Sequence, residues 1–152
     1  AFYLPSLLGS ENDIKRFSLT GERRDLNREK FEYNELLIHL EDKNSVARKN
    51  LDILSNAMKI RSRIKSFHPS AEMKCLTKGR RDIVAIQRGV EKNSIIAIHN
   101  ITDNKLDFSI DDSLNNSLKD ECNYCDYLSG KEYSNLNFVL DPFQVLWIGK
   151  NK

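Results

Sequence analysis

The sequence is poor in the features that mark several whole classes of protein. No apolar run in its 152 residues approaches the roughly 20 residues that a membrane-spanning helix needs, so no membrane partner is expected. Three cysteines do not make the disulfide framework of a small secreted domain, which leaves a reducing, cytoplasmic setting as the simpler expectation. A formal net charge of +2 is too small to predict a nucleic-acid partner.

What the chain does contain is a balance of core-forming and solubilising residues, 39% hydrophobic and 30% charged. Its length allows one domain, or one domain and a piece of another. The first eight residues, Ala1-Phe2-Tyr3-Leu4-Pro5-Ser6-Leu7-Leu8, are nearly all apolar, whereas a free terminus is normally polar. We therefore expect residues 2–8 to form a buried strand, and the chain to be the tail of a larger protein.

The next 60 residues carry helical signals. One helical turn is expected at residues 14–17, and a short amphipathic helix at 31–40. Ser45 is a suitable N-cap for a longer helix, which ends before Pro69. Its apolar face repeats at three- and four-residue steps, through Val46, Ala47, Leu51, Leu54, Met58 and Ile64.

Beyond Pro69 the pattern changes to short β-rich runs separated by turn residues. We expect strands at 72–76, 82–88, 94–100, 106–110, 136–140 and 143–148, and a polar loop at 111–116. Such spacing is typical of an antiparallel β-sandwich. The sequence thus predicts a helical part, residues 1–70, and a β-sandwich, residues 71–152.

This order resembles the carboxyl-terminal part of glycoside hydrolase family 13, the α-amylase superfamily. The stretch Arg24-Asp25-Leu26-Asn27-Arg28 is similar to the Arg-Asp-Ile-Asn-Arg signature of its sucrose phosphorylase branch. The resemblance implies an α+β fold, in which the last strand and helices of a truncated (β/α)8 barrel precede an antiparallel β-sandwich called domain C. It places residues 1–70 at the end of the barrel and 71–152 in domain C.

The same resemblance implies a retaining α-glucosyl-transferring parent enzyme, with a glucoside substrate and phosphate or a sugar as acceptor. The signature is followed by Glu29-Lys30 instead of His and an aromatic residue, which favours sucrose 6′-phosphate or glucosylglycerate over sucrose. An α-glucosidase or amylase-type hydrolase is the first alternative. A stand-alone carbohydrate-binding β-sandwich is the second, and an exposed row of aromatic residues would favour it.

Four residues are candidates for substrate binding. Arg28, the last residue of the signature, is implied to contact the donor glucose, because a planar guanidinium offers paired donors to hydroxyl groups. Asn12 and Asp13 lie where substrate loops leave the barrel, and Arg24, with Arg23, could meet a phosphate. The alternatives are a surface ion pair for Arg28, a polar turn that caps a short helix for Asn12 and Asp13, and a solvated basic loop for Arg23 and Arg24.

No catalytic residue, metal or cofactor is expected in this chain. Retaining glycosidases need two carboxyl groups about 5 Å apart, and no carboxylate here matches the family's catalytic motifs, so the fragment itself is expected to be inactive. Cys122 and Cys125 have the spacing of metal ligands, but only Cys75 remains as a further thiol for a four-ligand zinc site.

Apolar side chains of the barrel remnant are expected to be left exposed, or to be covered by a neighbouring chain through self-association. They are Leu4, Leu7, Leu8, Leu37, Leu40, Leu54 and Met58. The aromatic residues of the β-sandwich are expected to serve as core and not as sugar-stacking platforms. These are Phe108, Phe138, Phe143 and Trp147.

Overall fold

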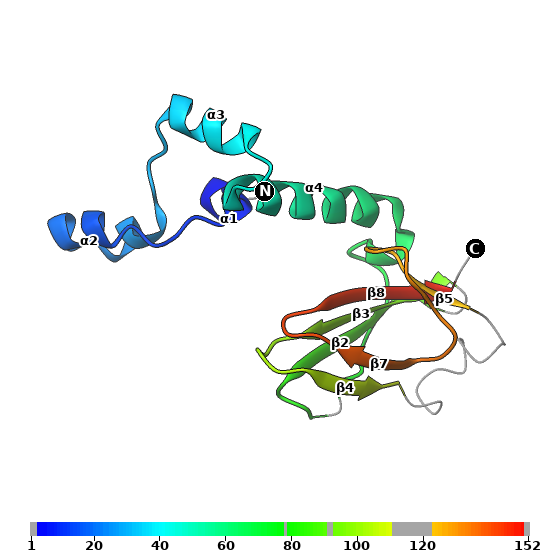
Figure 1. Cartoon of the computed structure of the whole chain (residues 1–152). Helices are drawn as coiled ribbons and strands as arrows, with labels where there is room; N and C mark the ends of the chain where they lie inside the picture. The colour runs from blue at the N-terminus through cyan, green and yellow to red at the C-terminus, as the bar shows by residue number, and fades with distance from the viewer. Residues whose placement is uncertain (1–2, 78, 91–92, 111–122, 151–152) are drawn as a thin grey trace. The chain divides into compact units, whose positions relative to one another are not determined.

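The computed structural model describes residues 3–77, 79–90, 93–110 and 123–150. The chain divides into two compact units, Ala1–Met58 and Lys59–Lys152, which we call the helical unit and the β unit (Figure 1). Among the described helices, none is both long and apolar enough to cross a membrane.

The helical unit contains four α-helices and one 3₁₀ turn in its described residues. They are α1 (Leu4–Leu8), α2 (Ile14–Thr20), η1 (Arg23–Asn27), α3 (Tyr33–Glu41) and α4 (Val46–Arg63), the last of which continues past Met58. The expected helices at 14–17, 31–40 and 46–64 are confirmed. Ser45 caps α4 as predicted, because its hydroxyl accepts the Arg48 N–H at 3.0 Å.

The strand expected at residues 2–8 is wrong for Leu4–Leu8, which form helix α1. Pro5 lies in its first turn, where a missing N–H costs nothing. Gly9 then closes the helix in the left-handed region, with φ of 65°. A short apolar run does not by itself separate helix from strand, and residues 1–2 lie outside the described part of the chain.

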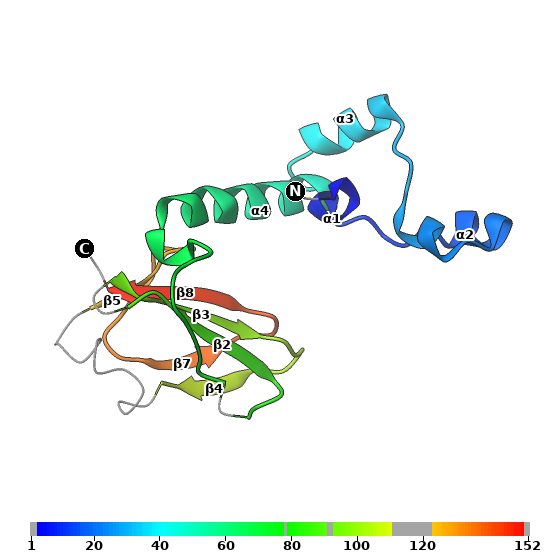
Figure 2. The same cartoon turned by 180° about the vertical axis from the view of Figure 1, so that it is seen from behind.

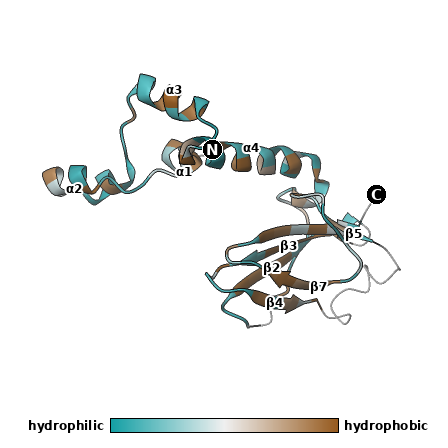
Figure 3. Ribbon diagram, viewed as in Figure 1, coloured by the Kyte–Doolittle hydropathy of each residue, from teal (hydrophilic) through white to brown (hydrophobic). Residues whose placement is uncertain are grey.

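The helical unit has almost no apolar core of its own. Among its described residues, only Leu8 and Asp25 are buried. Leu4 and Leu37 are 49% and 39% exposed, as expected for an unpartnered apolar face, while Leu7, Leu40, Leu54 and Met58 are half-buried. The same expectation is wrong for Leu8, which is buried within the chain itself. Figure 3 shows apolar segments along α1, α3 and α4. Whether a neighbouring chain covers them stays a prediction.

The β unit is an antiparallel β-sandwich, as predicted (Figure 2). One sheet has six strands in the order β1-β2-β3-β8-β5-β6, and the other pairs β4 with β7. The 3₁₀ turn η2 (Lys65–Phe67) precedes them. The strands are β1 (Met73–Cys75), β2 (Ile83–Arg88), β3 (Ile95–Asn100), β4 (Leu106–Ser109), β5 (Tyr124–Asp126), β6 (Glu132–Tyr133), β7 (Asn137–Leu140) and β8 (Val145–Lys150).

The core lies between the two sheets, because alternate residues of facing strands point inward. Strand β2 alternates between buried and half-buried residues along its whole length. The buried cluster consists of Leu76, Ile83, Ala85, Ile96, Ile98, Phe108, Ile110, Tyr124, Phe138, Leu140, Leu146 and Ile148. Phe108 and Phe138 are thus core residues, as predicted.

Two aromatic predictions in the sandwich are wrong. Phe143 is 64% exposed, because it occupies the third position of the Asp141–Gln144 turn with φ of 55°, and β8 begins only at Val145. Trp147 does not enter the cluster between the sheets, since its neighbours Leu146 and Ile148 do. Its ring instead packs on Phe67, with centroids 4.8 Å apart.

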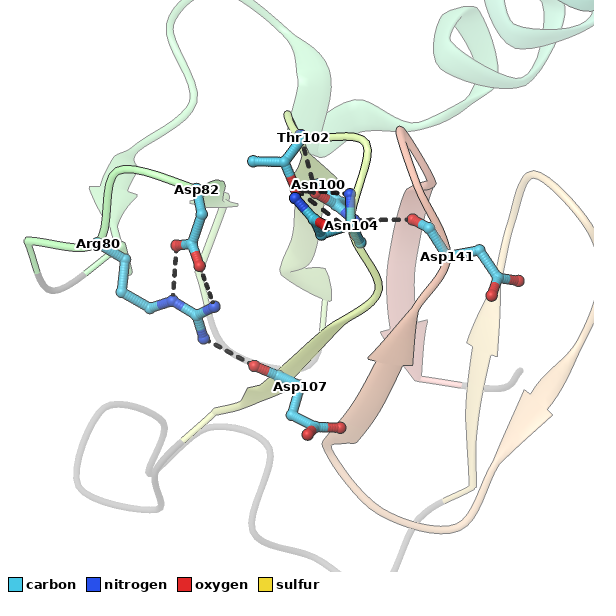
Figure 4. Close-up of polar contacts among 7 residues, drawn as sticks. All are labelled: Arg80, Asp82, Asn100, Thr102, Asn104, Asp107 and Asp141. Atoms are coloured by element: carbon cyan, nitrogen blue, oxygen red, sulfur yellow. Dashed lines mark hydrogen bonds and ion pairs between the residues drawn. The ribbon is translucent and has the colours of Figure 1, made fainter.

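Two polar clusters join the sheets (Figure 4). The Arg80 guanidinium donates to both carboxylate oxygens of Asp82 at 2.8 and 2.7 Å, and to the carbonyl of Asp107 on β4 at 2.7 Å. The side chain of Asn100, at the end of β3, donates to the carbonyl after β7, that of Asp141, at 2.9 Å. These groups satisfy one another, so we interpret the clusters as structural.

Candidate functional site

All four candidate residues lie in or beside one short stretch of the helical unit, formed by α2 and η1. Helix α2 ends at Gly21, which adopts the left-handed conformation with φ of 68° and donates its N–H to Phe17 at 2.8 Å. The chain then forms the 3₁₀ turn Arg23–Asn27, in which Asp25 N–H donates to Glu22 at 2.9 Å. The family-like signature is therefore a single tight turn that follows a helix.

Asp13 sits at the start of α2 and caps it. Its carboxylate accepts the Arg16 N–H at 2.8 Å, which is the capping role considered from the sequence. Its backbone N–H donates to the carbonyl of Leu26 at 2.6 Å. That bond brings the loop that carries Asn12 and Asp13 against the signature turn, although the two are separated by a helix in sequence.

The side chain of Asp25 links the signature turn to α2. It is one of two buried residues in the described helical unit, and its carboxylate lies 3.4 Å from Nε of Arg16 on α2. A hydrogen bond from the Thr20 hydroxyl and the nearby Arg16 charge outweigh burial, and they hold the pKa of Asp25 below its usual value. The sequence alone carries no signal for this pairing.

Arg28 follows the turn as its C-cap residue, and its N–H reaches the Asp25 carbonyl at 3.4 Å. Its side chain is exposed and, within the described part of the chain, has no hydrogen-bond or ion-pair partner. The surface ion pair considered as its alternative role does not form among these residues. Its guanidinium is therefore free to meet a ligand.

Arg24 and Asn12 are also exposed, and no contact links either side chain to Arg28 in the described structure. Arg24 makes only a loose pair with Glu22, at 3.8 Å, and its side chain is 67% exposed. An exposed pair of this length contributes little to stability. The structure thus gathers the backbone around the signature but leaves these side chains in solvent.

The helical unit also has an open cavity of about 630 Å³. Its wall includes Gly9, Glu11, Glu29, Phe31, His39 and Ser45. None of the four candidate residues lines it, although Glu11 and Glu29 adjoin two of them in sequence. Sequence reasoning missed this cavity, because it forms between segments with no shared periodic signal.

No metal centre is built from the described residues, since no three His, Cys, Asp or Glu side chains gather closely enough to hold an ion. Cys75 is exposed and Cys125 is half-buried. Hydrogen bonding with Thr77 lowers the pKa of the Cys75 thiol, whereas burial raises that of Cys125. Cys122 lies outside the described residues.

Comparison with known proteins supplies the family. A glucosylglycerate phosphorylase from Allomeiothermus silvanus is 36% identical over 101 residues, which cover 66% of this chain and 18% of that enzyme. The chain corresponds to the carboxyl-terminal part of family 13 glycoside hydrolases, in the sucrose phosphorylase-like branch. It thus spans under a fifth of the length of this curated relative. No family model matches the sequence.

Solved structures support the fold of a family 13 carboxyl-terminal region. An Anoxybacillus α-amylase matches 86% of the chain and 26% of its own, with a TM-score of 0.61 and 15% identity. The structure of AmyP in complex with maltose matches 69% of this chain and 21% of its own, with a TM-score of 0.58 and 16% identity. The trehalose-6-phosphate hydrolase of Bacillus licheniformis matches 76% of this chain and 20% of its own, with a TM-score of 0.52 and 14% identity. At these identities the likeness concerns the fold.

Proposed function

We propose that this chain forms one edge of the donor-sugar site in a glycoside phosphorylase that acts on glucosylglycerate or a similar anionic glucoside. The 36% identity to a glucosylglycerate phosphorylase carries the proposal. The exposed, unpaired Arg28 on a pinned turn supports it, since a guanidinium binds adjacent sugar hydroxyls through paired donors. Asn12, Asp13 and Arg24 complete the proposed rim.

The chemistry follows the retaining route. One carboxyl group protonates the leaving oxygen as the glycosidic bond breaks, while a carboxylate bonds to the anomeric carbon. Phosphate then attacks that carbon, which releases the carboxylate and forms glucose 1-phosphate. These two carboxyl groups must lie about 5 Å apart, and since no carboxylate of this chain matches the family's catalytic motifs, the proposal assigns both to other parts of the parent enzyme. Arg28 would hold the glucose, and Arg24 would attract phosphate or the glycerate carboxylate.

Product analysis of the full-length natural polypeptide that carries these residues tests the proposal. With glucosylglycerate and inorganic phosphate, we expect glucose 1-phosphate and glycerate in equal amounts, and little product without phosphate. The isolated 152-residue chain, at the same concentration, is expected to give none. Free glucose formed independently of phosphate would instead identify a hydrolase, the first alternative.

The stand-alone carbohydrate-binding alternative has less support in the sandwich. In its described residues, Phe143 is the one aromatic side chain that is largely exposed, whereas Phe108 and Phe138 are buried and Trp147 is half-buried. A single exposed ring does not form the row of aromatics that this alternative requires. Titration of the isolated chain with maltose, followed by Trp147 fluorescence, is expected to show no saturable change.

A further inference from the structure

We propose that Asp25 is a positioning residue for the donor site: by pairing with α2 it fixes the turn from which Arg28 projects, and so determines how tightly the donor sugar binds. This inference rests on the proposed role of Arg28. It assigns a function to a buried carboxylate and to Arg16, which lies outside the family-like signature.

The burial of Asp25 is the first observation. It is 7% exposed, while Arg24 before it is exposed and Leu26 after it is half-buried. Aspartate is among the residues least often buried, and a buried carboxylate is tolerated when it is paired. Here the partner is the Arg16 guanidinium on α2, whose Nε lies 3.4 Å from the carboxylate. The burial therefore serves to attach the turn to α2.

A second attachment lies one residue further along the turn. The Leu26 carbonyl accepts the N–H of Asp13, the N-cap residue of α2, at 2.6 Å. The Asp25 carbonyl in turn accepts the Arg28 N–H. Two consecutive residues are thus fixed to the helix, by a side chain and by the backbone, immediately before Arg28 leaves the turn.

The polar attachment matters because little apolar packing replaces it. Beyond Leu8, no apolar residue in the described helical unit is fully buried, so hydrophobic contacts hold the turn only weakly. Binding groups must be held within a fraction of an ångström to be effective. A turn that moves freely would present Arg28 in many positions, and a sugar would have to select one of them at a cost in affinity.

A double-mutant cycle in the full-length enzyme tests this. Because a donor contact present in both ground and transition states affects KM and not kcat, we expect Asp25→Asn to raise the KM for glucosylglycerate about tenfold, with kcat within about twofold. In the Arg28→Ala background, the same change is expected to alter KM by less than about twofold. Asp25→Glu should restore part of the loss, because it keeps the charge.

Two further variants guard against misfolding and non-specific effects. Arg16→Gln removes the partner from the other side and is expected to reproduce the KM change of Asp25→Asn. Asp52→Asn is the matched control, because it breaks an exposed ion pair with Arg48 on α4, at 2.8 Å. We expect it to leave KM and kcat unchanged.

The outcomes separate this inference from the proposed function. An equal effect of Asp25→Asn in both backgrounds, or no effect of either Asp25→Asn or Arg16→Gln, would overturn the positioning role while Arg28 remains a donor contact. If Arg28→Ala itself leaves both kinetic constants unchanged, the proposed function of Arg28 fails, and the positioning role fails with it.

Discussion

Asp126 gives the sharpest stability prediction, because it is a buried carboxylate with an unusual number of donors. It ends β5 and is 1% exposed. Its oxygens accept the Trp147 N–H from β8 at 2.8 Å, and the N–H groups of Leu128 and Ser129 in the following turn at 3.2 and 3.1 Å. The Ser129 hydroxyl donates as well, at 2.5 Å. One side chain therefore joins a strand, its neighbour and a turn.

The size of the effect follows from these partners. Asp126→Ala leaves three backbone N–H groups without their acceptor, and each unsatisfied buried donor costs about 1–3 kcal/mol. Ser129 is exposed and Leu128 is half-buried, so water can accept their N–H groups and reduce the cost of losing the carboxylate. The Trp147 N–H is less accessible to water, so most of the cost of its lost hydrogen bond remains. We expect a decrease of about 3 kcal/mol in the free energy of unfolding. Asp126→Asn keeps one acceptor oxygen and should cost about half as much.

Urea unfolding at pH 7 provides the assay. Trp147 is the single tryptophan, so fluorescence reports on the β unit alone. With a urea slope of about 1–3 kcal/mol per molar, Asp126→Ala should lower the midpoint by about 1 M or more. Asp107→Ala is the control, since Arg80 uses its backbone carbonyl, and it should stay within about 0.5 kcal/mol of wild type. A loss below about 1 kcal/mol for Asp126→Ala would refute this reasoning.

Three further changes test other parts of the β unit. Phe143→Gly removes an exposed side chain from a left-handed backbone. In urea titrations we expect the free energy of unfolding to stay unchanged or to rise by about 1 kcal/mol. A clear decrease would show that the Phe143 ring contributes packing. Gly149→Ala places a Cβ 2.6 Å from the Tyr127 ring and should cost about 1–3 kcal/mol by the same measurement; a neutral result would mean that the ring moves freely. Arg80 lowers the pKa of Asp82, so the stabilising pair is complete above the unfolded pKa of about 3.9 and is lost as pH falls through the lower folded value. As the pH is lowered, the Tm of Asp82→Asn should therefore fall less steeply than that of wild type. An equal fall of Tm in both proteins would contradict the pairing.

The sequence predicted the elements with strong periodic signals. Helix α4 and its Ser45 cap, and the strands around Ile83, Ile95 and Leu106, were all found from spacing and capping alone. Each carries its own local evidence, an apolar face or an alternating pattern. The short strands β5 and β6 were missed, because three and two residues are too few to show alternation.

The errors share a physical cause: apolar composition determines neither whether a segment forms a helix or a strand nor which way a side chain points. Leu4–Leu8 form a helix because Pro5 and Gly9 suit its two ends. Phe143 points into solvent because the Asp141–Gln144 turn sets its backbone. At the candidate site, the signature identified Arg28 by resemblance. The ion pair that fixes its turn joins residues nine positions apart, Arg16 and Asp25, and only the fold brings them together.

The most direct test of the proposed function is the steady-state phosphorolysis of glucosylglycerate by the full-length enzyme and its Arg28→Ala variant. A guanidinium that binds the donor glucose through charge-assisted hydrogen bonds should contribute about 3 kcal/mol, or about a hundredfold in kcat/KM. We predict a loss of that order, with glucose 1-phosphate still the product of the remaining activity. A variant with kcat/KM within about threefold of wild type would contradict the account, because Arg28 would then lie outside the donor site.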